Sequence, residues 1–241
     1  MSGAKTQAAL PAERMIRAAA DLLRAGGIDA VSTRGVAAAA GVQPPTIYRQ
    51  FGDKDGLLDA VADFLLQPYI AKKRSLIEAS KDPIHDLHAL WDLHVEFGLN
   101  EPHCYVLTYG QGRPGRIPPA GKETIALLGD VIARIGAEGR LAMSVDRATA
   151  YFRSTGTGFI LTQLSLPPDA RDPQLSAIIY TDTVSAITNN ADGTTAVAPD
   201  LPGRAVSLRE ALRDRKGLPL TGAERTLLAE WLNRLADGDG R

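Results

Sequence analysis

Residues 33–57 read TRGVAAAAGVQPPTIYRQFGDKDGL, a pattern that predicts a helix, a glycine turn, a second short helix and the start of a third. Thr33 can cap the first helix, and its inward-facing positions would be Val36, Ala37 and Ala40. Gly41 follows where the chain must turn sharply, because a residue without Cβ adopts a positive φ at little cost. The second helix has two apolar anchors, Val42 and Ile47. Two short helices crossing closely in this way predict a DNA-binding helix-turn-helix.

The same segment resembles the recognition helix and following helix start of the TetR (tetracycline repressor) family. The matching residues are Gly41, Val42, Gln43, Pro44, Pro45, Thr46, Ile47, Tyr48, Phe51, Lys54 and Leu57. The upstream Gly26-Gly27 pair and the entry into the motif also match. The resemblance covers roughly the first quarter of the chain. It is specific because so many residues match the family pattern in register.

The resemblance implies an all-α fold with two domains. Residues 1–54 would form the helix-turn-helix domain, with a linker helix from about residue 53. Residues 55–241 would form a helical effector-binding and dimerisation domain with extra C-terminal helices over 207–237. The implied function is a homodimeric, sequence-specific repressor that releases a palindromic operator when a small-molecule effector binds. No enzyme activity and no cofactor are expected.

The family's DNA contacts carry over to particular residues of this chain. Pro44, Pro45, Thr46 and Arg49 would face base edges, and Thr33, Tyr48 and Lys54 would contact the phosphate backbone, with Arg34 completing the set. Arg49 is the expected base reader, because a guanidinium can bond two acceptors of guanine, worth ~1–3 kcal/mol of discrimination. Each of these residues also has a purely structural interpretation, as a solvated charge or a packing side chain.

One departure from the family pattern concerns the start of the recognition helix. Gln43 stands where a short hydroxyl residue usually caps the helix, and Gln is a poor cap. Pro44 and Pro45 preset φ but remove two backbone N–H groups that could otherwise bind phosphate. Gln50 takes the place of a more usual His. The alternative function is therefore a small-molecule-binding module of the same fold that has lost specific DNA binding.

Composition and charge agree with a regulator. The 241 residues carry a net charge of −1, with +3 on residues 1–54 and −4 on the remainder, which suits a protein that presents one end to phosphate. A single cysteine, Cys104, excludes an intrachain disulfide. No signal-peptide pattern and no membrane-length apolar run occurs, so we expect a soluble cytoplasmic protein. Motifs for a serine nucleophile, a phosphate loop or a dinucleotide are lacking.

The remaining sequence predicts helices separated by turn-forming segments. A first helix would begin at Pro11 and end at Gly26-Gly27, and Asp53 would cap a longer helix that Pro68 kinks or ends. The basic run Lys72-Lys73-Arg74 would lie beyond it, as a solvated face or as a phosphate contact. Further helices are expected over 83–99, 120–138, 145–164 and 174–189, with a short segment at 103–110 and loops over 110–121 and 189–204.

Two tail helices are marked by capping boxes, Ser207 with Glu210 and Thr221 with Glu224. The last helix places an apolar stripe on one face: Leu227, Leu228, Trp231, Leu232 and Leu235. This stripe must be buried, against the chain's own body, which we favour, or against a second subunit.

The resemblance further implies a dimer interface and an effector pocket in the body. The interface would be a four-helix bundle of residues 145–164 and 174–189, where Gly156, Thr157 and Gly158 allow close approach. The candidate effector-lining residues, each of which could equally belong to the core, are Trp91, His94, Phe97, Tyr105, Tyr109, Tyr151, Phe152 and Phe159. His85, His88, Asp92 and His94 raise a metal question, but two ligands at i and i+4 are weak evidence, and no metal is expected.

Overall fold

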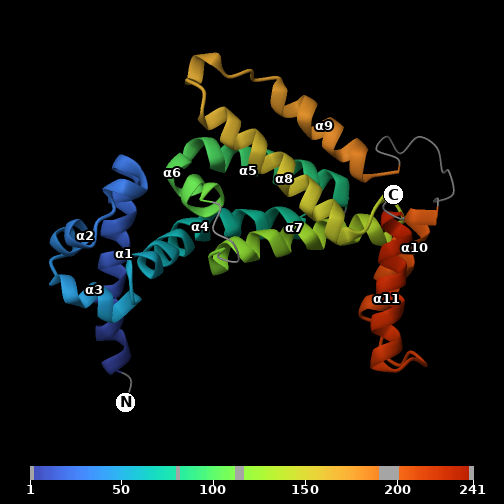
Figure 1. Cartoon of the computed structure of the whole chain (residues 1–241), viewed down its shortest axis with the longest axis horizontal. Helices are drawn as coiled ribbons and strands as arrows, with labels where there is room; N and C mark the ends of the chain where they lie inside the picture. Colours follow the sequence, from blue (N-terminus) through green and yellow to red (C-terminus); the bar gives the residue numbers. More distant parts are fainter. Residues whose placement is uncertain (1–2, 80–81, 112–116, 190–200, 239–241) are drawn as a thin grey trace. The chain divides into compact units, whose positions relative to one another are not determined.

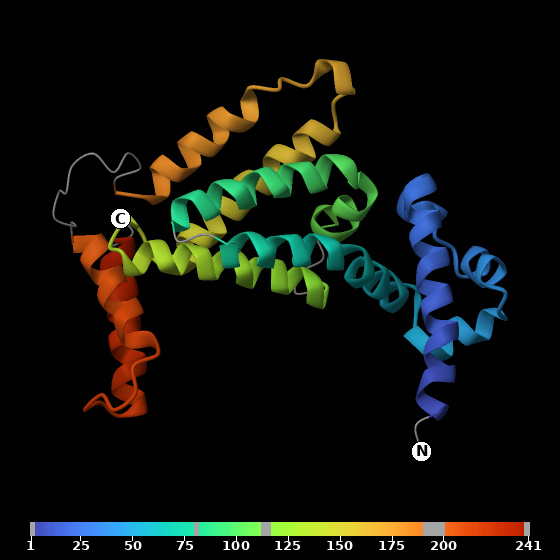
Figure 2. The same ribbon diagram turned by 180° about the vertical axis from the view of Figure 1, so that it is seen from behind.

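The computed structural model describes residues 3–79, 82–111, 117–189 and 201–238, shown as ribbons in Figures 1 and 2. Within these ranges the chain is helical and forms no β-strand, only an isolated bridge between Leu141 and Thr188, so the predicted all-α fold is confirmed. None of the described helices is long and apolar enough to cross a membrane. The chain divides into two compact units, Met1–Lys73 with Glu96–Thr124 and Arg74–Val95 with Ile125–Arg241.

The first unit begins with α1 (Gly3–Ala30), against which α2 (Thr33–Ala40) is packed, and α3 (Pro44–Phe51) is packed against α2 (Figure 1). The inward stripe of α1 is fully apolar and buried: Met15, Ala19, Ala20 and Leu23. The helical geometry breaks at Gly26 and Gly27, where the sequence predicted its end. The prediction that this helix begins at Pro11 is wrong, because good helix formers precede the proline and α1 runs through it from Gly3.

The long helix α4 (Lys54–Ala79) follows directly after α3. Contrary to the prediction, Pro68 does not end it, and the helix continues for another eleven residues. Tight packing explains this, because Leu65, Leu66, Tyr69 and Ile70 are buried on both sides of the proline and offset the lost hydrogen bond. The basic run Lys72-Lys73-Arg74 therefore belongs to the same helix that begins beside the helix-turn-helix.

The first unit is completed by the end of α5 (Pro83–Asn100), by α6 (Pro102–Tyr105), by a π-helical turn η1 (Val106–Gly110) and by the start of α7 (Pro119–Ala137). Part of the predicted 110–121 loop, residues 112–116, lies outside the described residues. Asp63 of α4 accepts a hydrogen bond from the Ala120 amide at 2.8 Å, which caps the beginning of α7.

The second unit contains the rest of α5 and α7, together with α8 (Val145–Leu164), a 3-10 turn η2 (Pro168–Ala170) and α9 (Leu175–Ile187). These bounds confirm the helices expected over 83–99, 120–138, 145–164 and 174–189 to within two residues. Trp91 lies at the centre of this core, 1% exposed, and its indole Nε1 donates to Ser176 Oγ at 3.0 Å. Arg134 neutralises the buried carboxylate of Asp86 in the same unit.

The tail forms an antiparallel hairpin of α10 (Leu201–Arg213) and α11 (Gly222–Asp237). The capping box of Thr221 and Glu224 is confirmed. The one predicted at Ser207 is wrong: α10 already begins at Leu201, inside the expected loop, and Ser207 Oγ donates to the Ala137 carbonyl. Residues 190–200 of that loop lie outside the described residues.

The hairpin docks on its own unit rather than extending away from it. Asp237 accepts hydrogen bonds from the backbone N–H and the hydroxyl of Ser144, at 2.8 and 3.0 Å. Leu232 and Ala236 of α11 are buried, whereas the adjacent stripe of Leu227, Trp231 and Leu235 is about half exposed. The predicted single apolar face is thus divided, with one half packed and the other half on the surface.

Candidate nucleic-acid interface

Helices α2 and α3 meet at a tight glycine turn. Gly41 adopts φ 66° and ψ 39°, the left-handed conformation that its position predicted. The predicted inward residues Val36, Ala37 and Ala40 are buried, and Ile47 of α3 is fully buried behind them. The N-cap of α2 is Ser32, not Thr33 as predicted, because the Ser32 hydroxyl accepts the Gly35 amide hydrogen bond at 3.0 Å.

Because only Ile47 of α3 is buried, the rest of this helix presents its side chains outward. Tyr48, Arg49 and Gln50 are exposed, with Tyr48 52% exposed. Pro45 is exposed at the N-terminal end of the helix, and Pro44 and Thr46 are half-buried. Of the residues that the sequence assigned to base reading, Pro45 and Arg49 are therefore exposed, which is a condition for entering a major groove, whereas Pro44 and Thr46 are partly covered.

Two of the predicted backbone contacts lie next to each other. The hydroxyl groups of Thr33, at the start of α2, and Tyr48, on α3, are 3.4 Å apart. Arg34 follows Thr33 and is exposed. These groups place two hydroxyls and a guanidinium beside the outward face of α3, where a phosphate oxygen could accept hydrogen bonds from all three.

The beginning of α3 has the weak cap that the sequence indicated. Gln43 is in an extended conformation and makes no side-chain cap hydrogen bond, and the two prolines occupy the first helical positions. The amides that would otherwise point at a phosphate are missing there. Sequence recognition at this end would therefore depend on apolar contact from Pro44 and Pro45.

The turn from α3 into α4 is close-packed around Gly56. Asp53 Oδ1 accepts the Gly56 amide hydrogen bond at 2.7 Å, which confirms Asp53 as the cap of α4. A Cβ on Gly56 would lie 2.1 Å from the Phe51 carbonyl oxygen, so this position admits no side chain. Lys54 begins α4 with an exposed side chain, next to backbone N–H groups that can join it in binding a phosphate.

A contact that sequence reasoning missed joins the helix-turn-helix domain to residues 96–124. Arg24 near the end of α1 forms a bidentate pair with Glu101, at 2.9 and 3.1 Å. His103 lies against Gly27, 3.2 Å from where a Cβ on this glycine would be. The two partners of each contact are far apart in the sequence, and no local pattern links them.

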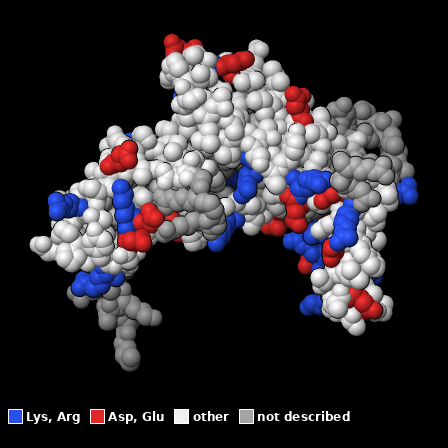
Figure 3. Space-filling view, in the orientation of Figure 1, with Lys and Arg blue, Asp and Glu red and all other residues white. Residues whose placement is uncertain are grey.

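Basic side chains are distributed over the helix-turn-helix. Figure 3 shows Lys and Arg side chains on the surface formed by the N-terminal helices. Among the exposed cations here are Arg34, Arg49 and Lys54. This surface carries the positive charge that association with phosphate requires.

The fold and this exposed helix define a class of protein, the bacterial helix-turn-helix regulators. Residues 15–61 match the family described as bacterial regulatory proteins, tetR family. The chain is also 48% identical over 52 residues to the class A tetracycline repressor from transposon 1721 of Escherichia coli. That match spans 22% of this chain and 24% of the repressor, so it concerns the DNA-binding region alone.

Solved structures extend the likeness beyond the N-terminal region at the level of the fold. A TetR-family regulator from Shewanella sp. PV-4 is 15% identical with a TM-score of 0.60, covering 75% of this chain and 99% of that one. FadR from Bacillus subtilis, solved in complex with stearoyl-CoA, is 18% identical with a TM-score of 0.60, covering 73% and 98%. The family model covers residues 15–61, and the solved structures, at 15% and 18% identity, extend the likeness to the fold of about three quarters of the chain.

The predicted effector-lining residues fall into two aromatic clusters, one within each unit. In the first unit, Phe97 stacks on Tyr69 at 4.4 Å between ring centroids, and Tyr105 lies 6.2 Å from Phe97 and 4.9 Å from Tyr109. In the second unit, Trp91 contacts Phe152 and Phe159, at 5.4 and 6.0 Å. His94 is close to Gly156 in the same unit, whereas Tyr151 is 45% exposed.

The first cluster contains a buried lysine that sequence reasoning placed on the surface or against phosphate. Lys73 is 5% exposed, while its neighbours Lys72 and Arg74 are exposed. Its Nζ lies 5.0 Å from the centroid of the Tyr69 ring and donates to the Thr124 carbonyl at 3.3 Å. Burial lowers the pKa of Lys73 from 10.5 to about 7. The basic run is therefore neither uniformly solvated nor uniformly available to DNA.

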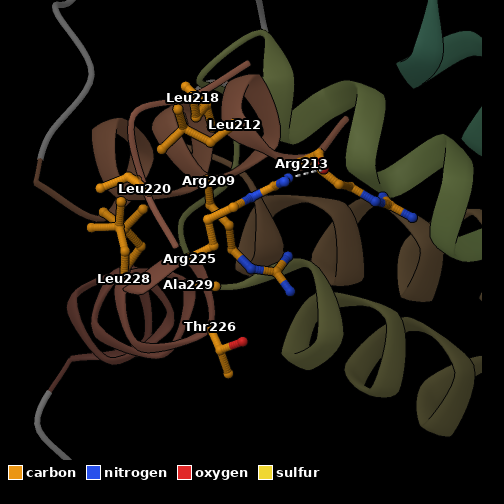
Figure 4. Close-up of a pocket in the computed structure, with 10 residues that line it drawn as sticks. Arg209, Leu212, Arg213, Leu218, Leu220, Arg225, Thr226, Leu228 and Ala229 are labelled. Atoms are coloured by element: carbon orange, nitrogen blue, oxygen red, sulfur yellow. Dashed lines mark hydrogen bonds between the residues drawn. The ribbon is translucent and has the colours of Figure 1, made fainter. Parts of the chain in front are cut away.

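A cavity of about 370 Å³ lies in the tail hairpin and contains none of the predicted effector residues (Figure 4). Its walls combine leucines of α10, α11 and their connection with three arginines, Arg209, Arg213 and Arg225. Arg209 and Arg213 share the single carboxylate of Glu210, at 2.9 and 3.2 Å, and Arg209 also lies 3.9 Å from Asp146. The hollow is thus an incompletely filled junction of two helices.

The histidines considered for a metal have other contacts. His88 Nε2 is 3.7 Å from Asp92, as the i,i+4 spacing predicted, and its ring stacks on Tyr180 at 4.5 Å. In the described part of the chain, no group of three or more His, Cys, Asp or Glu side chains could hold a metal ion.

Proposed function

We propose that this TetR-family protein is a homodimeric, sequence-specific repressor that releases a palindromic operator when a small molecule binds to its body. The observation that carries the proposal is the outward face of α3, where Arg49 and its neighbours are exposed while Ile47 alone anchors the helix. A helix whose fully buried residue is Ile47 and whose Tyr48, Arg49 and Gln50 are exposed is suited to insertion into a major groove.

The proposed domain division assigns DNA binding to residues 1–54 and effector binding and dimerisation to residues 55–241. Support for coupling comes from the contacts inside the first compact unit. Arg24 is paired with Glu101, and α4 runs without interruption from Lys54 to beyond Lys73. A change around residues 96–124 would thus be transmitted to the end of α1 and to α4, which is the physical requirement for linkage between two sites.

The proposed dimer forms through α8 and α9. The exposed side of α8 is lined by small residues, including Ser154, Gly158 and Thr162, and no atom lies within 4 Å of a Cβ built on Gly158. Ile178 of α9 is 53% exposed. Gly156 faces the interior instead, 3.3 Å from Trp91 for a built Cβ, so it serves internal packing. A two-fold axis through α8 and α9 would pair identical patches, as C2 dimers require.

The effector is proposed to contact the aromatic residues of the body. The relative FadR was solved with stearoyl-CoA, and a second relative, KstR2 of Mycobacterium tuberculosis, is described as a ketosteroid regulator. Stearoyl-CoA carries a long apolar acyl chain beside its charged nucleotide part, and aromatic walls are suitable for such a chain. The identity of this protein's own effector is not implied by likenesses of 18% and 19%.

The experiment that tests the proposal is selection of bound fragments from a random DNA pool by the purified protein, followed by salt titration on the winning sequence. A repressor of this kind enriches a two-fold symmetric site, and its affinity falls steeply with salt. Failure to enrich any sequence, by a folded protein that still binds small molecules, would instead establish the ligand-binding module that the Gln43-Pro44-Pro45 sequence keeps open.

A further inference from the structure

Lys73 is a buried cation without a buried counter-charge. Its side chain is 5% exposed, and in the described part of the chain it forms no ion pair. The neighbouring Lys72, by contrast, is exposed and lies 3.8 Å from Glu96. Burying an ammonium without a partner anion is costly, and proteins usually avoid it by pairing the charge.

The hydrogen-bonding capacity of Lys73 is also only partly used. An ammonium has three N–H donors. The structure gives Nζ one acceptor, the Thr124 carbonyl at 3.3 Å, and one ring face, that of Tyr69 at 5.0 Å. A carbonyl dipole and a π face attract a cation but do not neutralise it. Nζ therefore retains donors and a net charge that an anionic group could meet.

The side chains around Lys73 form a buried aromatic cluster. The ring of Tyr69 stacks on Phe97, and Tyr105 and Tyr109 continue the aromatic cluster. The Tyr109 hydroxyl is 2.9 Å from Thr124 Oγ1, so the residue that holds Lys73 through its carbonyl also contacts the cluster through its side chain. Small-molecule sites typically combine apolar or aromatic walls with a small number of polar groups.

The backbone near this cluster is irregular as well. Tyr109 is in the π-helical turn η1, Val106–Gly110, which follows the four-residue helix α6. π-helical turns are rare and occur frequently at functional sites. The cluster draws on α4, α5, α6, η1 and α7, all within one compact unit.

We propose that Lys73 binds an acidic group, a carboxylate or phosphate, of the effector, and that the aromatic cluster of Tyr69, Phe97, Tyr105 and Tyr109 holds the apolar part beside it. This rests on the proposed small-molecule control of the protein and names the chemical class of its ligand: an amphipathic acid. The anchor lies on α4, the helix that begins at the DNA-facing Lys54, so an anion bound at Lys73 acts directly on the connection to the DNA-binding helices.

Isothermal calorimetry on the full chain without DNA tests this assignment. The probes are decanoate and 4-phenylbutyrate, each compared with the alcohol of the same carbon skeleton, together with inorganic phosphate. We expect at least one acid to bind wild-type protein and its matched alcohol to bind about tenfold more weakly or worse. Lys73→Met should lose that preference, while Lys72→Met, which removes an exposed neighbouring charge, should keep it.

The stability of the ligand-free variant provides the second measurement. If Lys73 serves a ligand rather than the fold, Lys73→Met should melt at the same temperature as wild type or higher, since an unpaired buried charge is replaced by an apolar chain of similar length. A marked drop in melting temperature, equal binding of acids and alcohols, or no binding of any acid would each overturn the assignment. None of these readouts involves DNA, so a failure of operator binding is recognised separately.

Discussion

Arg49 is the residue through which base recognition is best tested. It lies on the exposed side of α3, two positions from the buried Ile47, and no partner in the structure fixes its guanidinium. Lys54 is equally exposed but begins the next helix, where contact with a phosphate is expected. Comparing variants of these two residues therefore distinguishes recognition of the DNA sequence from attraction to the DNA backbone.

Arg49→Ala should weaken binding to the selected operator by about tenfold or more and change binding to random DNA far less, because a bidentate guanine contact is worth ~1–3 kcal/mol. Lys54→Ala is the matched control and should weaken both alike, reducing the salt slope by about one unit. Fluorescence anisotropy at several salt concentrations measures both. Equal losses for Arg49→Ala on the two DNAs would remove it from base reading.

Lys73 makes the stability of the protein depend on pH. Its folded pKa of about 7 lies below the ordinary 10.5, so between these values the unfolded chain binds more protons and stability rises with pH. Relative to Lys73→Met, the wild-type free energy of unfolding should increase by on the order of 2 kcal/mol from about pH 7 to about pH 9. Urea unfolding measures this.

The comparison with Lys73→Met removes the contribution of other titratable groups to the pH dependence of stability, because these groups are present in both proteins. The Tyr69 ring lies against Lys73, and burial raises the pKa of the Tyr69 phenol well above its ordinary value. A constant difference between wild type and Lys73→Met across this range would show that the ammonium is better solvated than its burial indicates.

At the scale of elements, the helix-turn-helix depends on two tight turns. Gly41 allows the reversal between α2 and α3, and Gly56 allows α4 to start directly against the end of α3. The second requirement concerns space rather than conformation, since any side chain at position 56 meets the Phe51 carbonyl. The spacing between α3 and the start of α4, both of which we propose contact DNA, therefore depends on the absence of a side chain at position 56.

Gly56→Ala should lower the free energy of unfolding by about 1–3 kcal/mol, the usual effect of overpacking. It should also weaken operator binding, because α3 and Lys54 are displaced relative to each other. Gly222→Ala, at a helix start where no atom lies within 4 Å, is the control and should be near neutral. Thermal unfolding and anisotropy report the two effects. A stable Gly56→Ala variant with normal affinity would mean that α4 can shift freely.

For the whole molecule, two exposed apolar surfaces compete for the role of dimer interface. One lies on α8 and α9, with Tyr151 and Ile178, and the other is the outer stripe of α11, with Trp231 and Leu235. The first consists mainly of small residues, which allow helices to approach closely, and we assign the dimer to it. The second is narrower, because its other half is already packed against α10.

Ile178→Glu should dissociate the dimer and abolish cooperative binding to the palindrome, because a buried unpaired charge at the interface costs several kcal/mol. Leu235→Glu introduces the same charge on the α11 stripe and should leave the dimer intact. Analytical ultracentrifugation distinguishes the variants. The reverse result, with only Leu235→Glu monomeric, would transfer the interface to the tail.

The sequence by itself determined the local features of this protein. The pattern of residues 33–57 predicted the glycine turn, the buried side of α2 and the Asp53 cap, because these depend on neighbours within one or two helical turns. Periodicity likewise located α5, α7, α8 and α9 to within two residues. The resemblance to the TetR family rested on the same short-range pattern and is confirmed.

The tertiary structure decided what depends on residues distant in the sequence. Pro68 lies inside a helix because packing overrides a local breaking signal. Lys73 reads as part of a basic run, yet it is buried because Tyr69 and Thr124 lie against it. Arg24 pairs with Glu101 across 77 positions. Periodicity records which side of a helix is apolar, but only the folded chain brings a particular partner to it.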